Sequence, residues 1–485
     1  MTQSGFRKAL TILIIVGILV KVIISFENGI SDPDTWWHLA AGKYMVDNHA
    51  IPHQDIFSWT VSGQEWITHE WLAEVLFYLG YLAGGFWGVL CILLILAGLL
   101  LIFYFKLLSM PKDSCLVATL TLIVVGQLIV PFLEIRPQVF SYLFFVVFLY
   151  VLYLFVTGGK DYLFSLPLIS ILWANSHGSF LVGPALVILF IFCGLPRIKD
   201  ERFTNFHLQK RQLLQLSLCA LLCVVAAALN PNGLKLLTYP FATMGDNQMT
   251  NAIQEWLSPN FHDLYYQVFL VYYMVTFITM ILSPKKIVIN DLLLYLIFGA
   301  AAFLYIRFIP YALLLSGLIW PRYFQPRLEF KTDLSKVKNF LLPLVLLFYV
   351  FVLAVRAPSQ NVINHRFTPK EADYPMAALD YLKNHPLKGR MLNDYGWGGY
   401  LIWNRPEEKV FIDGRADVYL EKVFGDYINI TRLKPEAASL LETYDIDYVF
   451  MPASAPLIQA LRFSPCWSVY YKDKTTTILV KDSRS

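Results

Sequence analysis

The chain has little charge for its length. Of its 485 residues, 15% are charged and 57% are hydrophobic, whereas roughly 25% are charged in a typical soluble domain. The net charge of +4 is small, and the basic residues lie in loops between apolar runs. This is not the charge pattern of a nucleic-acid-binding protein. The composition therefore indicates a membrane protein.

The chain also lacks a cysteine framework. Five of its six cysteines fall in or beside apolar runs, and only Cys466 lies in a plainly soluble region. This pattern excludes a set of structural disulfides, and no cysteine or histidine spacing is typical of a metal site.

Long apolar runs recur through residues 1–356. Lipid offers backbone N–H and C=O groups no hydrogen-bond partners, so such runs are expected to be helices. Arg7 and Lys8 precede the first run as they would in a signal peptide, but no small-residue cleavage site follows, so we expect a retained span. We predict eleven spans, at 6–26, 86–105, 115–131, 139–156, 162–174, 179–195, 213–229, 264–282, 292–306, 309–320 and 340–355.

The loops between these spans differ sharply in basic residues. One alternate set of loops holds 17 lysines and arginines, and the opposite set holds four, namely Lys43, Arg136, Lys235 and Arg307. Basic loops stay in the cytoplasm. We therefore predict a cytoplasmic N-terminus and, with an odd number of spans, a C-terminal segment on the outer face.

The first outer loop, residues 27–85, begins with an unusual polar cluster. Asp32-Pro33-Asp34-Thr35-Trp36-Trp37-His38 follows the first span directly. Ionisable groups beside a bilayer are costly, which makes such a cluster a candidate functional site. Asp32 at the N-cap and Pro33 at the first turn predict a helix to about Asp47. A second helix is predicted from about Thr68 to Gly84-Gly85.

Further polar candidates fall in the predicted outer loops. Each also has a structural explanation. Asp32 can cap a helix and Asp34 can favour its first turn, while arginines at span ends can lie along the interface. The predicted site residues are Asp32 and Asp34 as catalytic residues and His38, His69, Glu70, Arg136, His177, Glu255 and Arg307 as substrate-binding residues.

Residues 357–485 lose the membrane pattern and predict an extracytoplasmic α/β domain. Alternating runs predict strands at 390–393, 410–413, 446–451, 467–471 and 475–481, with helices at 374–384, 435–444 and 455–461. Gly396-Trp397-Gly398-Gly399-Tyr400 lacks the pattern of a phosphate-binding loop, and its glycines favour tight turns.

This arrangement resembles the GT-C superfamily of multispanning glycosyltransferases, which use polyprenyl-phosphate-linked sugars. The resemblance lies in a first span followed by an acidic Asp-x-Asp-type motif and a long outer loop with two juxtamembrane helices. The chain is also similar to a bacterial branch that shares Asp55-Ile56-Phe57-Ser58, His69-Glu70-Trp71-Leu72, Arg136-Pro137-Gln138, Asn175-Ser176-His177-Gly178 and Asn393-Asp394-Tyr395-Gly396.

The resemblance implies a mainly α, GT-C-like helical bundle over residues 1–356 that performs single-displacement sugar transfer with inversion. It places the protein in a bacterial plasma membrane, with a polyprenyl-phosphate-sugar donor and a glycan, lipid or protein acceptor as partners. The superfamily's catalytic carboxylate matches Asp32 or Asp34, and the sequence does not choose between them. A divalent metal could bind Asp32, Asp34, His38, His69 and Glu70, although no spacing specifies a site.

Two other functions are compatible with a multispanning protein. A flippase of lipid-linked saccharides would be expected to show internal repeats and ionisable groups within spans. Here no repeat is visible, and Lys21 is the main charge inside a predicted span. A non-catalytic scaffold for envelope assembly is the third hypothesis, and it would tolerate loss of the acidic pair.

Overall fold

The protein forms two compact units in the computed structural model, which describes residues 3–27, 29–110, 115–195, 197–245, 250, 253–324 and 373–482. Unit 1 comprises Met1–Glu27, Leu90–Leu229 and Gln254–His365. Unit 2 comprises Asn28–Val89, Asn230–Ile253 and Arg366–Ser485. The predicted first outer loop therefore groups with the C-terminal segment. The predicted boundary at residue 356 and the predicted span 340–355 lie outside the described residues.

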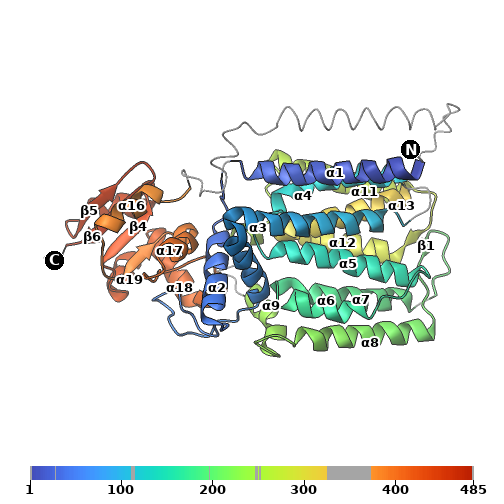
Figure 1. Cartoon of the computed structure of the whole chain (residues 1–485), viewed down its shortest axis with the longest axis horizontal. Helices are drawn as coiled ribbons and strands as arrows, with labels where there is room; N and C mark the ends of the chain where they lie inside the picture. Colours follow the sequence, from blue (N-terminus) through green and yellow to red (C-terminus); the bar gives the residue numbers. More distant parts are fainter. Residues whose placement is uncertain are drawn as a thin grey trace. The chain divides into compact units, whose positions relative to one another are not determined.

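Unit 1 is a bundle of apolar helices that run side by side (Figure 1). Every predicted span before residue 325 is helical, as the membrane constraint requires. The helices are α1 (Gln3–Ser25), the second half of α3 (Trp71–Leu108), α4 (Cys115–Ile129), α5 (Gln138–Val156), α6 (Ser165–Ala174), α7 (Val182–Gly194), α8 (Lys210–Ala227), α11 (Leu264–Leu282), α12 (Ile289–Leu304) and α13 (Ile309–Tyr323).

Four helices among the described residues are long and apolar enough to cross a membrane by length and composition, namely α3, α5, α8 and α11. The other apolar helices are shorter, so the number of crossings remains a prediction. The shortness of the run at 309–320 has a structural reason. Its helix, α13, packs against α4, α11 and α12 and is buried over most of its length, so it is a core helix of the bundle.

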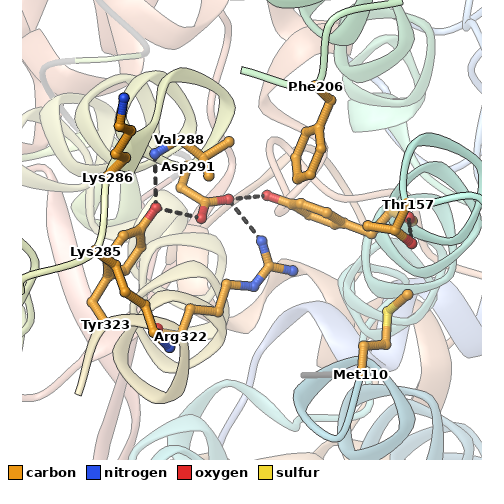
Figure 2. A pocket seen from close by; sticks show the side chains of 10 residues that line it. Met110, Thr157, Phe206, Lys285, Lys286, Val288, Asp291, Arg322 and Tyr323 are labelled. Carbon is orange, nitrogen blue, oxygen red and sulfur yellow. Dashed lines mark hydrogen bonds and ion pairs between the residues drawn. The ribbon is translucent and has the colours of Figure 1, made fainter. Parts of the chain in front are cut away.

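A buried carboxylate ties three helices of unit 1 together (Figure 2). Asp291 on α12 accepts hydrogen bonds from Tyr153 Oη on α5 at 2.6 Å and from Tyr323 Oη on α13 at 2.9 Å. Arg322 Nη1 pairs with the same carboxylate at 2.8 Å. Next to this cluster, β1 (Phe203–Thr204) and β2 (Ile287–Val288) form a short parallel ladder.

Unit 2 contains a four-stranded sheet in the order β3-β4-β6-β5. The β3–β4 pair is parallel, and the β4–β6 and β5–β6 pairs are antiparallel. The sequence predicted these strands to within a few residues. They are β3 (Met391–Asn393), β4 (Tyr448–Pro452), β5 (Trp467–Lys472) and β6 (Thr476–Lys481).

Some helices of unit 2 were predicted from the sequence and others were not. α2 (Asp34–Asn48), α16 (Met376–Asn384), α19 (Ala437–Thr443) and α20 (Pro456–Leu461) match predicted helices, whereas α17 (Gly398–Asn404) and α18 (Ala416–Thr431) were not predicted. α9 (Lys235–Gly245) also belongs to this unit. The helix predicted to end at Gly84-Gly85 does break there, because both glycines have non-helical backbone, and the chain continues beyond this kink as the second half of α3.

The prediction of a strand at 410–413 is wrong. This segment is extended but pairs with the first loop instead of the sheet. Trp59 N–H donates to Val410 O at 3.0 Å and Val410 N–H donates to Phe57 O at 3.1 Å. The backbone hydrogen bonds of Val410 are thus satisfied by residues about 350 positions earlier in the chain, a pairing that no local pattern reports. The N–H groups of Phe411 and Ile412 donate to the side-chain oxygen of Asn393 on β3.

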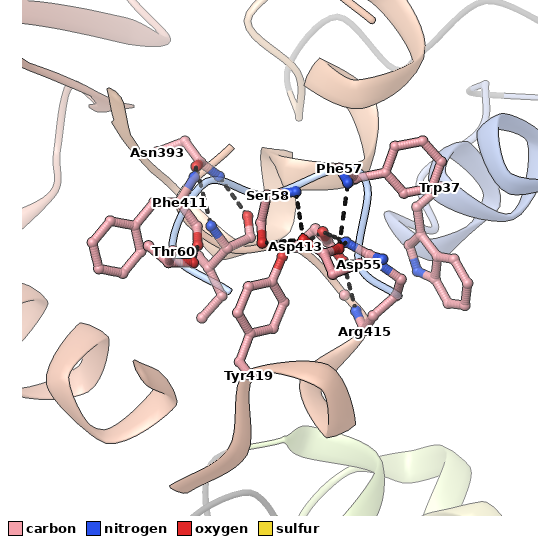
Figure 3. Close-up of polar contacts among 12 residues, drawn as sticks. Trp37, Asp55, Phe57, Ser58, Thr60, Asn393, Phe411, Asp413, Arg415 and Tyr419 are labelled. Carbon is pink, nitrogen blue, oxygen red and sulfur yellow. Dashed lines mark hydrogen bonds and ion pairs between the residues drawn. The ribbon is translucent and has the colours of Figure 1, made fainter. Parts of the chain in front are cut away.

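A buried ion network lies next to this pairing between Val410 and the first loop (Figure 3). Arg415 binds Asp413 through Nε at 2.8 Å and Nη2 at 2.6 Å, and Nη2 also lies 2.8 Å from Asp55 Oδ1. Tyr419 Oη donates to Asp413 at 2.5 Å, and Ser58 Oγ donates to Asp55 at 2.6 Å. All three ionic side chains are at most 1% exposed.

We predict that Arg415→Met destabilises unit 2 by roughly 3–5 kcal/mol, because it leaves two buried carboxylates without their cation. Pulse proteolysis of the full-length protein measures the effect as faster cleavage within residues 373–482. The matched control is Arg390→Met, since Arg390 pairs with Asp445 on the surface and such pairs contribute less than about 1 kcal/mol. Equal cleavage rates for the two variants would contradict a structural role for the network.

Candidate functional site

The acidic motif lies at the start of α2. Asp32 Oδ1 accepts a hydrogen bond from the backbone N–H of Asp34 at 3.0 Å, and Pro33 precedes the first helical residue. The helix thus begins at Asp34, one residue later than predicted. Asp34 Oδ1 in turn accepts from Trp37 Nε1 at 3.0 Å. Both carboxylates are half-buried, so part of each remains accessible.

The two tryptophans of the motif are buried, although tryptophan is common in the headgroup layer of membrane proteins. Trp36 is 1% exposed and Trp37 is 7% exposed. Trp36 packs edge-on against Tyr374 and Tyr400, with ring centroids 5.6 Å and 5.1 Å away. These aromatic contacts belong to the core of unit 2, and they fix the orientation of the first turn of α2.

Two glycines allow the C-terminal segment to approach this turn closely. A Cβ on Gly414 would lie 2.0 Å from Asp34 Oδ1, and one on Gly399 would lie 2.8 Å from Pro33 O. Gly399 is helical in α17, so its role is close backbone approach and not the tight turn expected from the sequence. Asp34 is therefore held directly against the 413–415 segment.

A second cluster joins α2 to the start of α3. His38 Nδ1 lies 3.1 Å from Glu74 Oε1 and 3.8 Å from Glu70 Oε2. One ligand atom from each of the three residues lies within 4.8 Å of the others. Glu74 is 1% exposed, and its Oε2 has no hydrogen-bond partner among the described residues. Imidazole and carboxylate donors suit a divalent metal ion.

The membership of this cluster differs from the ligand set expected from the sequence. Glu74, which the sequence analysis missed, takes part, while Asp32, Asp34 and His69 do not. His69 instead places Nδ1 3.0 Å from Ile67 O and Nε2 3.6 Å from Glu70 Oε1. The spacing of His38, Glu70 and Glu74 gives no signal because the residues lie on two helices.

In unit 1, three predicted residues meet in one ion cluster. Glu255 lies 3.4 Å from Arg136 Nη1 and 3.8 Å from Arg307 Nη1. The guanidinium of Arg307 also lies 4.2 Å from the ring centre of Trp256. All three charged side chains are about a quarter exposed. Two cations and one carboxylate leave a net positive charge that can meet an anion.

His177 lies in a hydrogen-bonded cluster of its own. Its Nδ1 accepts from the backbone N–H of Ser179 at 3.2 Å and contacts Ser141 Oγ at 2.8 Å. An Nδ1 that accepts a backbone N–H carries no proton, so the geometry assigns the proton of the neutral ring to Nε2. Trp173 Nε1 and Tyr311 Oη complete the cluster through Ser141 and Ser179.

The structure therefore distributes the predicted residues over both units. Unit 2 holds Asp32, Asp34, His38, His69 and Glu70, and unit 1 holds Arg136, His177, Glu255 and Arg307. Asp55, Asp413 and Arg415 were not among the predicted site residues, and no spacing in the sequence signals their mutual contacts.

Solved structures of similar fold identify the architecture. An oligosaccharyltransferase from Archaeoglobus fulgidus, in a crystal structure tethered with an acceptor peptide, matches with a TM-score of 0.60 at 12% identity, over 99% of this chain and 74% of that one. The oligosaccharyltransferase AglB of the same organism, in complex with an inhibitory peptide and a dolichol-phosphate, matches with a TM-score of 0.61 at 11% identity, over 99% and 75%. The protein has the GT-C glycosyltransferase fold.

A mycobacterial arabinofuranosyltransferase, AftD, matches the same GT-C fold with a TM-score of 0.54 at 14% identity, over 98% of this chain and 41% of that one. No protein-family model matches the sequence, and no curated protein matches it. The resemblance inferred from the acidic motif is thus confirmed at the level of the GT-C fold.

The Glu255 cluster of this GT-C fold predicts a pH dependence of stability. Burial would raise the pKa of Glu255, but Arg136 and Arg307 outweigh it and hold the pKa below its ordinary value. A carboxyl group with a lowered folded-state pKa stabilises the protein above its unfolded pKa, about 4.3, and loses that contribution as the pH falls through its folded pKa.

We therefore predict that Glu255→Gln lowers the thermal midpoint of the purified protein at pH 7 and that this difference from wild type shrinks as the pH is lowered toward 3. Glu201→Gln, at an exposed position, serves as the control and should track wild type throughout. A difference for Glu255→Gln that stays constant with pH would contradict the ionic contribution.

Proposed function

We propose that the protein is an inverting glycosyltransferase of a bacterial plasma membrane. It moves a sugar from a polyprenyl-phosphate-linked donor to an acceptor on the outer face, which is a glycan, a lipid or a protein. The observation that carries the proposal is the oriented acidic pair Asp32 and Asp34 at the start of α2, in a chain with the GT-C fold. One neighbour of that fold was solved with a dolichol-phosphate, which supports a lipid-phosphate donor.

The reaction needs one base and a set of anion partners. An acceptor hydroxyl or amide attacks the anomeric carbon, its proton passes to a carboxylate, and the bond from that carbon to the phosphate oxygen breaks. The polyprenyl phosphate leaves with the electron pair of that bond. A base within hydrogen-bond reach contributes about 10²–10⁴-fold to such a step.

We assign the role of base to Asp34. Its side chain is oriented by Trp37 and lies against Gly414. Asp32 sets the start of the helix by accepting the N–H of Asp34. For the leaving phosphate we assign Arg136 and Arg307, whose combined charge exceeds that of Glu255. The neutral ring of His177, together with His69, serves substrate binding in this proposal.

We predict that Asp34→Asn lowers transfer by at least about 100-fold, because the amide cannot accept the proton. Asp32→Asn is predicted to retain more activity, because its amide oxygen can still accept the Asp34 N–H. The measurement is release of polyprenyl phosphate from isotope-labelled lipid-linked sugars in isolated membranes, by mass spectrometry.

Asp47→Asn is the matched control, since Asp47 lies on the same helix and makes an exposed ion pair with Lys43. It should release polyprenyl phosphate at the wild-type rate. If Asp34→Asn also did so at equal protein level, the base assignment would fail. If wild-type membranes released none beyond a deletion strain, the flippase and scaffold hypotheses would be favoured.

The cluster of His38, Glu70 and Glu74 fits a divalent metal ion in this proposal, because Glu74 keeps a buried oxygen without a hydrogen-bond partner among the described residues. A bound metal would supply positive charge for a phosphate group. Without a metal, the same residues form a buried histidine–carboxylate pair that joins α2 to α3.

We predict about one equivalent of divalent metal in the purified wild-type protein and at least about 10-fold less in Glu74→Gln, as loss of a ligand implies. Elemental analysis by mass spectrometry measures both. Glu65→Gln, an exposed acid of the same loop, should retain the metal. Wild-type protein that is purified without chelators and holds less than about a tenth of an equivalent would show that the cluster is only structural.

A further inference from the structure

Unit 1 contains a cavity that the transfer reaction does not use (Figure 2). Its volume is about 310 Å³, within the range of small-molecule sites. Its walls come from the C-terminal ends of α5 and α13, from the start of α12 and from the loop segments at 110, 206 and 285–288. The lining residues are Met110, Tyr153, Thr157, Phe206, Lys285, Lys286, Val288, Asp291, Arg322 and Tyr323. All of these residues belong to unit 1, in or beside loops that the charge pattern places in the cytoplasm.

The cavity is strongly cationic. Lys285, Lys286 and Arg322 provide three positive charges against the single carboxylate of Asp291. That carboxylate is 1% exposed and already accepts from Tyr153, Tyr323 and Arg322. Asp291 and Arg322 form an ion pair, so the excess positive charge of the lining comes from Lys285 and Lys286. The net charge of the lining is therefore positive, which favours an anion.

The side chain of Arg322 is held in place by its neighbours in the cavity wall. Arg322 is 14% exposed, and its guanidinium lies 3.9 Å from the ring centre of Tyr153. Lys285 Nζ donates to Arg322 O at 2.8 Å, and Lys286 Nζ donates to Asp200 O at 2.6 Å. Backbone carbonyl oxygens hold both ammonium groups, and the carboxylate of Asp200 also interacts electrostatically with Lys286. Arg322, Lys285 and Lys286 all line the cavity, and guanidinium and ammonium groups both bind phosphate oxygens.

Apolar side chains in and near the cavity can contact the acyl chains of a lipid. Met110, Phe206 and Val288 give the cavity an apolar side. The adjacent helices α11 and α12 carry exposed apolar side chains, including Leu282 and Ile297, which are 69% and 51% exposed. Basic pockets between helices near the cytoplasmic surface bind anionic lipid head groups.

We propose that this cavity binds a phosphate group, supplied by the head group of an anionic phospholipid. The site is separate from the acidic motif, and its occupation does not depend on the proposed transfer reaction. A soluble phosphate is the other source of the same chemistry, and the experiment below separates the two.

The test uses native mass spectrometry of the full-length protein in detergent. The probes are phosphatidylglycerol, diacylglycerol with the same acyl chains, and inorganic phosphate. Wild type is expected to retain phosphatidylglycerol over diacylglycerol by at least about 10-fold, which corresponds to roughly 1.4 kcal/mol. The Lys285→Ala/Lys286→Ala variant should lose most of this preference. Both lysines are exposed, so the variant is expected to fold.

The matched control is Lys210→Ala/Arg211→Ala, two exposed cations at the start of α8 that do not line the cavity. It should keep the wild-type preference. Retention of inorganic phosphate without any preference for phosphatidylglycerol would overturn the lipid assignment in favour of a soluble ligand. Equal binding of all probes by wild type and the Lys285→Ala/Lys286→Ala variant would overturn the site itself.

Discussion

The geometry of the acidic motif depends on the burial of one arginine. Arg415 sits between Asp413 and Asp55 with its guanidinium 1% exposed, and burial of three charges is costly unless each finds partners. Tyr419 and Ser58 supply further donors to the carboxylates, while the rings of Trp66 and Phe57 face the guanidinium at 4.5 Å and 5.0 Å. These contacts fix the 413–415 segment on the first loop, and Gly414 then lies against Asp34. The half-buried carboxylate of Asp34 is thus positioned by a network centred on Arg415.

The two units differ in the charged side chains that gather at their candidate sites. Unit 2 gathers carboxylates and a histidine around α2, which suits proton transfer and metal binding. Unit 1 gathers arginines around Glu255 and lysines with Arg322 around the cavity, which suits phosphate groups. The proposed transfer reaction uses the carboxylates of unit 2 and the arginines around Glu255, whereas the cavity beside Arg322 takes no part in it.

The sequence predicted the parts of the fold that local patterns encode. Apolar length located the helices of unit 1, and alternation located four strands of unit 2. The segment 410–413 was assigned to the sheet because its composition is that of a strand, yet Phe57 and Trp59 provide its partners. Tryptophan is common in the headgroup layer of membrane proteins, but the ring of Trp36 completes the core of unit 2 with Tyr374 and Tyr400. Glu74 was missed because its relation to His38 arises only when two helices pack. Partners far apart in the sequence decide all three cases.

The most direct test of the central claim is chemical analysis of a deletion strain beside its parent. Envelope glycans, glycolipids and glycoproteins are compared by mass spectrometry, together with the pool of polyprenyl-phosphate-linked sugars. The account predicts that one sugar disappears from one acceptor class while its lipid-linked donor accumulates, and that the wild-type gene restores both. Unchanged glycans together with an unchanged donor pool would contradict it.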